Sequence, residues 1–582
     1  MRIVRYAAVA VMALALGADS QMPGGRAAQE PPWTVPVAGH RPVVAGEHPR
    51  LLFRRGDLPA LRKKAATPEG RAILRRLRRL LDGAEGETMT TRFNEAEKAY
   101  AGRTEAAPIG TLTIGHAAGY GLLYQLTGDR RYAAFGRESF ERALAGVRDR
   151  DDRYSYRRPG GALRAGPSLG WLAVGYDLCY DGWDAPTRER LGRAIAAYAE
   201  EVPKGKGTVV LTLDQLAAGT MPPGSNHFGM QVGGAALALL AVSREPWIEQ
   251  ARIEELLQTV EKSLIRNLAE GFGDGGFFAE GDGTGSMASQ IVYLTALQAW
   301  RNAMGRDFIA GPRPNARMLT LKWIYQTVFR DGRPDFWPIR GGYPHNVWAR
   351  EGMSGAAYFA LGFGAVPTAE RSAMKWIYNR FLAAADARQG TPYDTASLYP
   401  QFAAAAFVNW PAELPEREPE SVLPHCYRDA ARDFYCWRDR WRDADDTVIT
   451  LLAREARGYM NAAPDAALAI NVRGRHLTWG RVASGPVRRW AMSPRGETSS
   501  LVLADGVGFG VDFTGASGAG VMLVTTGPAE GQVVRLGANE LTFFFPATEA
   551  PPTARIEGDA VVVGRQRVRL RDGGLVFSQA GR

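Results

Sequence analysis

The sequence predicts a chain of two structural parts, a ring of α-helical hairpins followed by an antiparallel β-sandwich. From about Gly46 to Asn409, segments with apolar residues three and four positions apart alternate with Gly, Pro or Asp breaks. Beyond Ser421 the pattern changes to alternation, in β-branched and aromatic runs bounded by Gly, Asn and Asp. A chain of 582 residues also exceeds the roughly 250–300 residues at which one core stops growing, so at least two domains are expected.

About eleven helices with short connections are predicted in the first part, as antiparallel helix pairs require. Their ranges are 58–81, 110–126, 131–147, 169–179, 186–201, 230–242, 246–268, 286–304, 314–329, 354–361 and 370–383. Small residues such as those at 233–236 (GGAA) let helices approach closely, which a ring of hairpins would satisfy. An elongated solenoid is the competing architecture, although the chain lacks the fixed repeat period that solenoids show.

A segment rich in proline and glutamate, residues 410–420, separates the two parts and is predicted to be a linker. The helical domain is therefore assigned to residues 46–409 and the sandwich to residues 421–582. The predicted strands of the sandwich lie within 447–453, 466–472, 501–513, 521–525, 533–545 and 560–570.

The N-terminus has the pattern of an export signal. Arg2 and Arg5 precede an apolar run at 6–17 and then small residues suited to cleavage, which gives a signal peptide at 1–18 and a linker at 19–45. The apolar run is shorter than the roughly 20 residues that a membrane-spanning helix needs. We expect a periplasmic or secreted protein with no membrane part after the signal is removed.

The net charge of +10 suits an anionic polymer as partner in an exported protein. Nucleic acid is set aside, because no basic cluster interleaved with aromatics and no RNA-binding signature occurs. Cys426 and Cys436 flank a polar turn and could be joined across a hairpin in an oxidising compartment, whereas Cys179 is expected to be buried. Three scattered cysteines do not make a metal site, and neither a metal nor another cofactor is expected.

Four local phrases, in the same order as the predicted domains, carry a family resemblance. They are residues 48–53 (HPRLLF) opening the first helix, 176–181 (YDLCYD), 224–227 (GSNH) opening another helix, and 274–281 (DGGFFAEG). The chain resembles the heparinase II/III-like and alginate-lyase-like polysaccharide lyases. The resemblance implies an incomplete (α/α) toroid joined to a β-sandwich, and cleavage of an acidic polysaccharide by β-elimination.

The sequence departs from the family pattern at two places. The family usually has a catalytic tyrosine after the Glu-Gly pair, where this chain has residues 282–285 (DGTG). The family's sandwich usually has a His-x-His-x-Asp stretch that supplies a histidine and, in some members, a zinc ligand. Its counterpart here is 461–465 (NAAPD), in which only Asp465 matches.

β-Elimination on a uronic acid needs a group that neutralises the carboxylate, a base for the C5 proton and an acid for the leaving oxygen. Asn226 and His227 are predicted for the first task, because the N-terminus of a helix favours an anion. The resemblance implies in addition that this pair contacts the uronate and helps to remove its proton. The alternative is that Ser225 or Asn226 is only a helix cap and His227 only a buried imidazole.

A loop between helices at 335–348 concentrates titratable and aromatic residues. In the absence of the usual tyrosine, Tyr343 or His345 is predicted to act as base or acid. Arg340 could bind a carboxylate in a bidentate pair, and Trp337 or Trp348 could stack on a sugar ring. The alternative is a turn whose aromatic side chains plug the toroid.

Glu280 and Asp282 form a compact acidic pair in a glycine-rich loop, and both are predicted to contact the substrate. A glycoside hydrolase would use two carboxyl groups about 5–9.5 Å apart. We expect instead that Glu280 orients a substrate hydroxyl or a neighbouring histidine. Tyr459, beside the incomplete sandwich motif, is a further candidate for the site.

Three functions remain open, because sites and not folds set function. The leading hypothesis is a polysaccharide lyase. A glycoside hydrolase on a toroid is the second, and a catalytically inactive carbohydrate-binding homologue is the third. His40, His48 and His476 are interpreted as structural, and His116 and His425 are left open.

Overall fold

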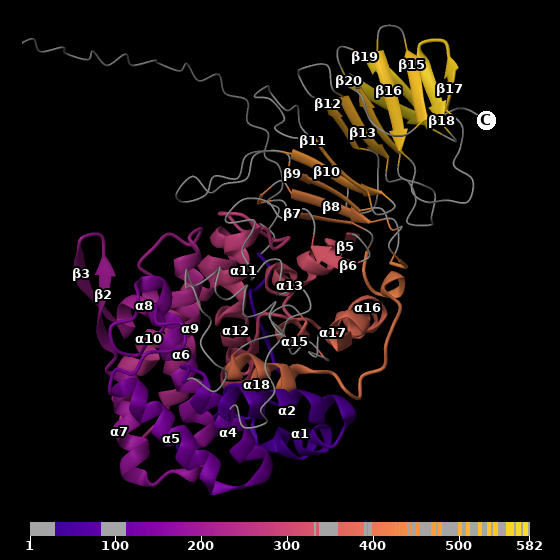
Figure 1. Ribbon diagram of the computed structural model, residues 1–582. Coiled ribbons are helices and arrows are strands. Elements are labelled where there is room, and N and C mark those ends of the chain that lie inside the picture. The colour runs from indigo at the N-terminus through magenta and orange to yellow at the C-terminus, as the bar shows by residue number, and fades with distance from the viewer. Residues whose placement is uncertain are drawn as a thin grey trace, which may run out of the picture.

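The computed structural model describes residues 30–82, 112–330, 333–336, 359–388, 393, 399–424, most of 426–452, and strands between 467 and 579. The described chain is helical first and then built of antiparallel strands, which confirms the predicted order (Figure 1). Among these residues, no helix is long and apolar enough to cross a bilayer. The predicted export signal, residues 1–18, lies outside them.

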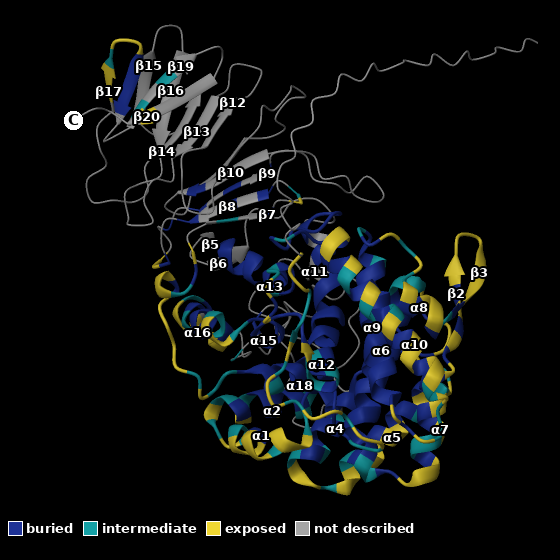
Figure 2. Cartoon of the chain, turned by 180° about the vertical axis from the view of Figure 1, so that it is seen from behind, coloured by how far each residue is buried: buried dark blue, intermediate teal, exposed yellow. Residues whose placement is uncertain are grey.

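Five helices form the interior of the helical array: α4 (His116–Thr127), α6 (Ala162–Cys179), α9 (Asn226–Val242), α12 (Tyr293–Met304) and α18 (Pro400–Asn409). These helices are buried along most of their length, as Figure 2 shows for α6, α9 and α12. In α9, every described residue from Phe228 to Val242 is buried. A helix that is apolar all round must be covered on all sides, so these segments belong inside the array.

The surrounding helices are amphipathic and expose their polar faces to solvent. In α5, for example, Ala133, Gly136 and Phe140 point inward at helical spacing. The surrounding helices are α1 (Leu58–Ala65), α2 (Pro68–Asp82), α5 (Arg130–Leu144), α7 (Ala185–Ala196), α8 (Leu213–Ala218), α10 (Gln250–Arg266) and α16 (Thr368–Ile377). The shorter helices α11 (Asp282–Gln290), α13 (Asn315–Tyr325), α15 (Ala360–Phe363) and α17 (Ala383–Arg388) complete the described set.

The interior helices α6 and α9 run in the same direction and lie unusually close. Gly166 lies against Met230, and Gly170 against Gly234, so residue numbers rise together along both helices. A Cβ atom on Gly234 would lie 1.9 Å from the carbonyl oxygen of Gly166. The prediction that small residues allow close helix approach is therefore confirmed, and the N-termini of α6 and α9 lie side by side.

The helical array closes on itself. Helix α18, at the end of the helical part, contacts α2 and α4 at its beginning. A linear solenoid would keep its first and last helices apart, so the solenoid alternative is wrong and the toroid-like arrangement is correct.

The strands of the second part form three antiparallel sheets. The sheet nearest the helices has the order β11-β10-β9-β8-β7, the next β12-β13-β14-β16-β15, and the last β17-β18-β19-β20. Their bounds are β7 (Cys426–Asp429), β8 (Phe434–Arg438), β9 (Val448–Leu452), β10 (Ala467–Val472), β11 (Arg475–Trp479), β12 (Ser499–Val502), β13 (Gly508–Asp512), β14 (Met522–Thr526), β15 (Gln532–Leu536), β16 (Asn539–Phe544), β17 (Ala554–Glu557), β18 (Ala560–Val563), β19 (Gln566–Arg571) and β20 (Gly574–Gln579). Their packing as a β-sandwich stays a prediction.

The helix predicted at 186–201 is too long. Helix α7 ends at Ala196, and the chain then forms a hairpin of β2 (Ala199–Lys204) and β3 (Gly207–Thr212). The tight turn at Gly205, with φ of 60°, and the β-branched residues that follow favour the hairpin over a continued helix. Two further short pairs join β1 (Val35–Pro36) to β4 (Arg306–Asp307), and β5 (Thr327–Arg330) to β6 (Arg333–Phe336).

The expected pairing of Cys426 with Cys436 is wrong. The register of β7 and β8 places Cys426 opposite Trp437, and Cys436 opposite Tyr427. The thiol of Cys436 is buried, and its Sγ lies 3.9 Å from the carbonyl oxygen of Tyr325. Cys179 is a buried free thiol, as expected.

The segment predicted as a linker is held against the helical array. The ammonium group of Lys375 donates to the carbonyl oxygens of Pro411, Ala412 and Leu414, each at 2.9 Å. Trp410 is buried among the helices. The predicted domain limits stay predictions. The start of the segment between the helices and the strands is held to the helices by these hydrogen bonds.

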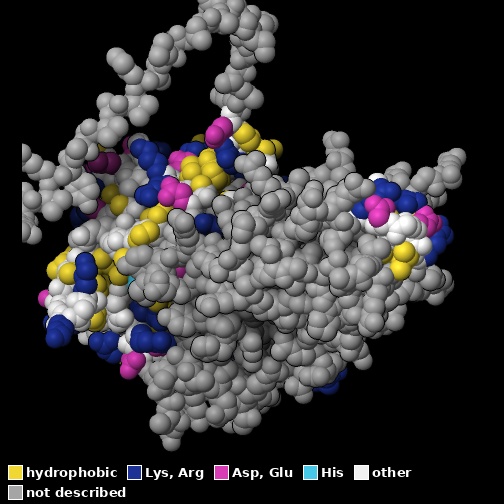
Figure 3. Space-filling model, turned by 90° about the horizontal axis from the view of Figure 1, so that it is seen from above, with side chains coloured by type: hydrophobic (Ala, Val, Ile, Leu, Met, Phe, Trp, Pro, Cys, Tyr) yellow, Lys and Arg dark blue, Asp and Glu magenta, His cyan; other side chains and the backbone are white. Residues whose placement is uncertain are grey.

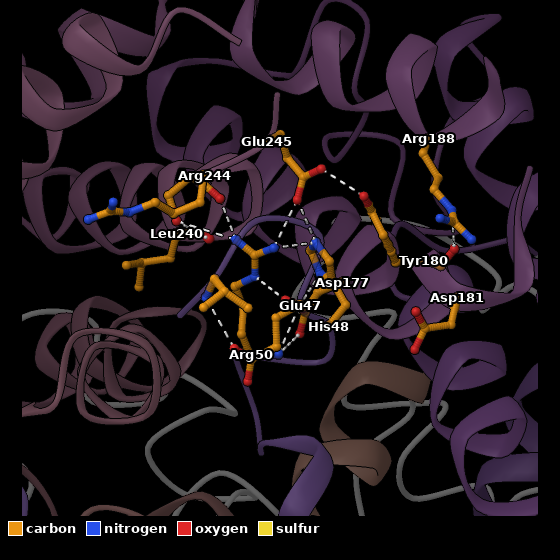
Figure 4. Close-up of polar contacts among 12 residues, drawn as sticks. Glu47, His48, Arg50, Asp177, Tyr180, Asp181, Arg188, Leu240, Arg244 and Glu245 are labelled. Carbon is orange, nitrogen blue, oxygen red and sulfur yellow. Dashed lines mark hydrogen bonds and ion pairs between the residues drawn. The ribbon is translucent and has the colours of Figure 1, made fainter. Parts of the chain in front are cut away.

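A buried polar network fixes the segment that precedes η1 (Arg55–Asp57) (Figure 4). His48 contacts Asp177 through Nδ1 at 2.7 Å and Glu245 through Nε2 at 2.9 Å. Glu245 also accepts from Arg50 and from Tyr180, each at 2.8 Å. His48 is fully buried within this network, so the structural role predicted for it is confirmed.

We expect Glu245→Ala to lower the free energy of unfolding by about 3–5 kcal/mol, because it leaves Arg50 as an uncompensated buried charge. Denaturant titration followed by circular dichroism measures this loss. Glu249→Ala is the matched control, because Glu249 is exposed and its change should stay within about 0.5 kcal/mol. Equal stability of the two variants would contradict a stabilising role for the network.

Candidate active site

The N-terminus of α9 supplies the first group of candidate residues. Ser225 caps the helix, its Oγ accepting from the backbone N–H of His227 at 3.4 Å. Asn226 is buried, and its side-chain amide forms no hydrogen bond within the described part of the chain. The helix opens at GSNH as predicted, so Asn226 and His227 lie where the helix dipole favours an anion, although their own backbone N–H groups donate to Glu280 and Ser225.

His227 is half-buried, and its Nδ1 atom is buried without a partner in the described structure. Burial, together with the positive charge of Arg164, lowers the pKa of His227 to about 4. The imidazole is therefore neutral at neutral pH. A neutral imidazole with an unoccupied nitrogen can accept a proton from a ligand.

The glycine-rich loop that leads to Glu280 is fixed from two sides. From the strand side, the Asp429 carboxylate at the end of β7 accepts from the backbone N–H groups of Gly275 at 3.1 Å and Phe277 at 2.9 Å. From the helical side, the backbone N–H of Asn226 donates to Glu280 Oε2 at 3.3 Å. The first sheet thus takes part in placing Glu280 next to the N-terminus of α9.

Glu280 is 4% exposed. Burial raises the pKa of its carboxyl group to about 7, although the hydrogen bond from Asn226 acts in the opposite direction. A large share of the Glu280 carboxyl groups is therefore protonated at neutral pH. A protonated carboxyl can donate a hydrogen bond, and it does not repel an anionic ligand.

Asp282 has a partner within the protein. Its carboxylate pairs with the Lys322 ammonium at 2.6 Å, and both side chains are about 1% exposed. Lys322 also lies over the rings of Phe277, Trp323 and Phe434. The predicted substrate contact of Asp282 stays a prediction, and the ion pair fixes the start of α11 beneath the glycine-rich loop.

Sequence reasoning missed Arg164, which lies in the first turn of α6 beside His227. The signal was a single arginine in an otherwise small and apolar stretch, GGALRAG at 160–166. Such a residue is buried once the stretch forms an interior helix, but only the structure shows that no acidic side chain of the described part of the chain pairs with it.

A pocket lined by aromatic side chains opens next to the start of α6. Tyr154, Trp171, Tyr399 and Phe402 line it, together with Asp149, whose pKa burial raises to about 7. The guanidinium of Arg164 lies 5.3 Å from the centre of the Tyr154 ring, which connects the pocket to the α9 terminus. Trp171 and Phe402 are almost completely buried, so the pocket belongs to the packing of the helical interior.

The remaining predicted residues lie outside the described part of the chain. They are Trp337, Arg340, Tyr343, His345, Trp348 and Tyr459. Their assignment to the site stays a prediction. Of the predicted set, the structure brings together Asn226, His227 and Glu280.

The fold and these residues define a helical toroid-like protein with antiparallel sheets and a half-buried polar site at the helix N-termini. No family model and no curated protein sequence matches the chain. It is similar to solved structures of heparinase III (TM-score 0.39, 11% identity, 83% of this chain and 77% of the other) and of heparan sulfate lyase HepC from Pedobacter heparinus (0.37, 12%, 88% and 79%). It is also similar to a Paenibacillus xanthan lyase (0.40, 12%, 88% and 49%). At this distance the reaction has to be inferred from the site itself.

Proposed function

We propose that the chain is a polysaccharide lyase that cleaves an acidic, uronic-acid-containing polysaccharide by β-elimination. The observation that carries the proposal is a neutral, half-buried His227 with an unoccupied Nδ1, next to a buried arginine at a helix N-terminus. This combination supplies a proton acceptor next to positively charged groups that can bind a carboxylate. β-Elimination on a uronate needs both.

The described residues can divide the reaction as follows. The side chain of Asn226 and the N-terminus of α9 hold the uronate carboxylate, which makes the C5 proton more acidic. His227 takes that proton, the electron pair forms the C4–C5 double bond, and the C4–O bond to the leaving sugar breaks. Glu280 in its protonated form donates a hydrogen bond to a substrate hydroxyl.

The leaving oxygen must receive a proton. Tyr343 and His345 are the residues that we propose for this step, on the strength of their place in the sequence. Trp337, Arg340 and Trp348 in the same loop, and Tyr459 in the second part, are proposed substrate contacts. The protein is further proposed to be exported, with the acidic polysaccharide as its partner.

A glycoside hydrolase is the weaker alternative. It would need two available carboxyl groups, and Asp282 is already engaged by Lys322 in a buried ion pair. Glu280 then lacks the partner that the sequence pattern suggested.

Purified protein incubated with alginate, heparan, chondroitin and ulvan-like polymers tests the proposal. Absorbance of the unsaturated uronate product and release of reducing ends are followed together. We expect both signals on at least one polymer. Reducing ends without new double bonds would identify a hydrolase, and no signal on any polymer would favour a binding protein; either result contradicts the lyase.

A further inference from the structure

Arg164 is a buried cation that has no counter-charge among the residues that the structure describes. The residue is 7% exposed, and its Nε atom is fully buried without a hydrogen bond. Within the described structure its guanidinium forms no hydrogen bond and no ion pair, and it lies over the Tyr154 ring, 5.3 Å from the ring centre. A cation–π contact offsets only part of what a buried charge loses in hydration.

Other buried arginines of the chain show how this protein satisfies a guanidinium that is structural. Arg50 donates to Glu245 at 2.8 Å and to the backbone oxygen of Glu47 at 2.7 Å (Figure 4). Arg438 pairs with Asp446 at 3.0 Å. Among the described residues Arg164 has no such partner, although it is buried nearly as deeply, and an anionic group of a ligand would supply one.

The position of Arg164 indicates the charge and the place of that partner. Helices α6 and α9 run in parallel with their N-termini side by side, and the Gln231 side chain of α9 donates to the carbonyl oxygen of Ala162 at 3.4 Å. Two helix N-termini and one guanidinium therefore lie together, and all three favour an anion. Because the charge of Arg164 acts on His227, the space lies next to the candidate base.

One face of the molecule can be compared with this internal position. On the face shown in Figure 3, the described Lys and Arg side chains are interspersed with Asp and Glu. The net charge of +10 is thus not gathered into one basic patch on the described part of that face. A buried guanidinium such as that of Arg164 can recognise a single anionic group more specifically than this mixed surface can.

We propose that Arg164 binds the carboxylate of the uronic residue whose C5 proton is transferred to His227, in a charge-assisted and bidentate pair. This inference rests on the proposed function and deepens it, because it names the residue that selects a carboxylated sugar. Binding would also neutralise the cation that disfavours protonation of His227, so the base would become stronger only when the acidic sugar is in place.

The test measures binding separately from turnover. The probes are a short oligouronate, the same oligomer with its carboxyl groups reduced to alcohols, and a carboxyl-reduced oligomer carrying sulfate esters. We expect Arg164→Gln to weaken binding of the oligouronate by about 10- to 100-fold, and to leave binding of the neutral oligomer unchanged. Arg164→Lys should recover part of the loss, because it restores the charge without the planar fork.

Stability supplies an independent readout. Arg164→Gln should leave the melting temperature of the ligand-free protein unchanged or higher, since it removes an unpaired buried charge. Arg50→Gln is the matched control and should lower it, because Arg50 has internal partners. A large drop for Arg164→Gln would show that the residue has a structural partner, and would overturn the inference.

The outcomes also separate this inference from the proposed function. If a polymer is cleaved but Arg164→Gln changes neither binding nor kcat/KM, Arg164 is not the carboxylate site and the lyase assignment survives. If no polymer is cleaved but Arg164→Gln abolishes selective binding of the oligouronate, the site is correct and the lyase assignment fails. If the variant weakens only the sulfated probe, the site binds a sulfate ester and the carboxylate assignment is overturned.

Discussion

Replacing His227 by alanine is expected to lower kcat on the cleaved polysaccharide by about 10²–10⁴-fold, the usual contribution of a positioned general base. His227 is neutral because its pKa lies near 4, and its Nδ1 atom has no partner within the described chain. Removing the imidazole therefore removes a proton acceptor without breaking an internal hydrogen bond of the ring. Initial rates of double-bond formation measure the loss.

His40→Gln is the matched control for this change. His40 contacts the carbonyl oxygen of Asn302 at 3.0 Å and lies beside Gly305, at the C-terminal end of α12. That end is opposite to the helix N-termini of the site, so turnover should be unaffected. If His227→Ala keeps its full rate while Tyr343→Phe loses it, the base lies in the 335–348 loop. If both variants keep full rates, the assigned site is wrong.

The sequence predicted the helical part well because local signals mark most of its boundaries. Asp129 and Ser225 are caps in the structure, and Gly128 and Gly305 end helices in the left-handed conformation. Periodicity could not show which helices are interior neighbours, because ring closure depends on contacts between α18 and the start of the chain. Helix α18 itself was not among the predicted segments.

The register of the strands could not be predicted from the sequence. The turn between Cys426 and Cys436 suggested that the two thiols face each other, but a shift of one residue pairs Cys426 with Trp437. Alternation shows which residues of a strand share a face, but it does not show which residue of the neighbouring strand lies opposite. An offset of one residue therefore places the two cysteines at different positions of the ladder. The hairpin at 199–212 was missed because its first strand continues the polar pattern of α7.

Three residues of the candidate site followed from local sequence, and a fourth required the fold. Asn226, His227 and Glu280 stand in short phrases with glycine and a cap, and the structure brings them together. Arg164 is 63 positions before His227 in the numbering, and its importance depends on the absence of an acidic partner among the described residues. No local pattern reports a missing partner, so this residue could be recognised only in three dimensions.

Glu280 is expected to set the alkaline limit of activity. Its pKa is raised to about 7 by burial, so the protonated carboxyl that donates to the substrate is lost above that pH. His227, with a pKa near 4, sets the acid limit, since it must be neutral to accept a proton. The profile of kcat/KM should therefore be bell-shaped, with limbs near these two values.

Two substitutions separate the charge of Glu280 from its hydrogen bond. Glu280→Gln keeps a neutral donor and should abolish the alkaline limb, so that activity persists above pH 7. Glu280→Ala should lower kcat by about 10²-fold at all pH values. Glu270→Gln is the control, because Glu270 is an exposed residue paired with Arg266 at 3.3 Å and should leave the profile unchanged.

Stability should depend on pH through the same carboxyl group. Because the pKa of Glu280 is raised in the folded state, the folded chain keeps a proton between about pH 4.5 and 7 that the unfolded chain has released. More protons are then bound in the folded state, so the free energy of unfolding falls as the pH rises through this window.

Asp149 and Asp429, whose pKa values burial also raises to about 7, contribute equally to wild type and variant. The difference between wild type and Glu280→Gln thus isolates Glu280. An alkaline limb that stays near pH 7 in Glu280→Gln, or an unchanged slope of stability against pH, would show that Glu280 is not the group that titrates there.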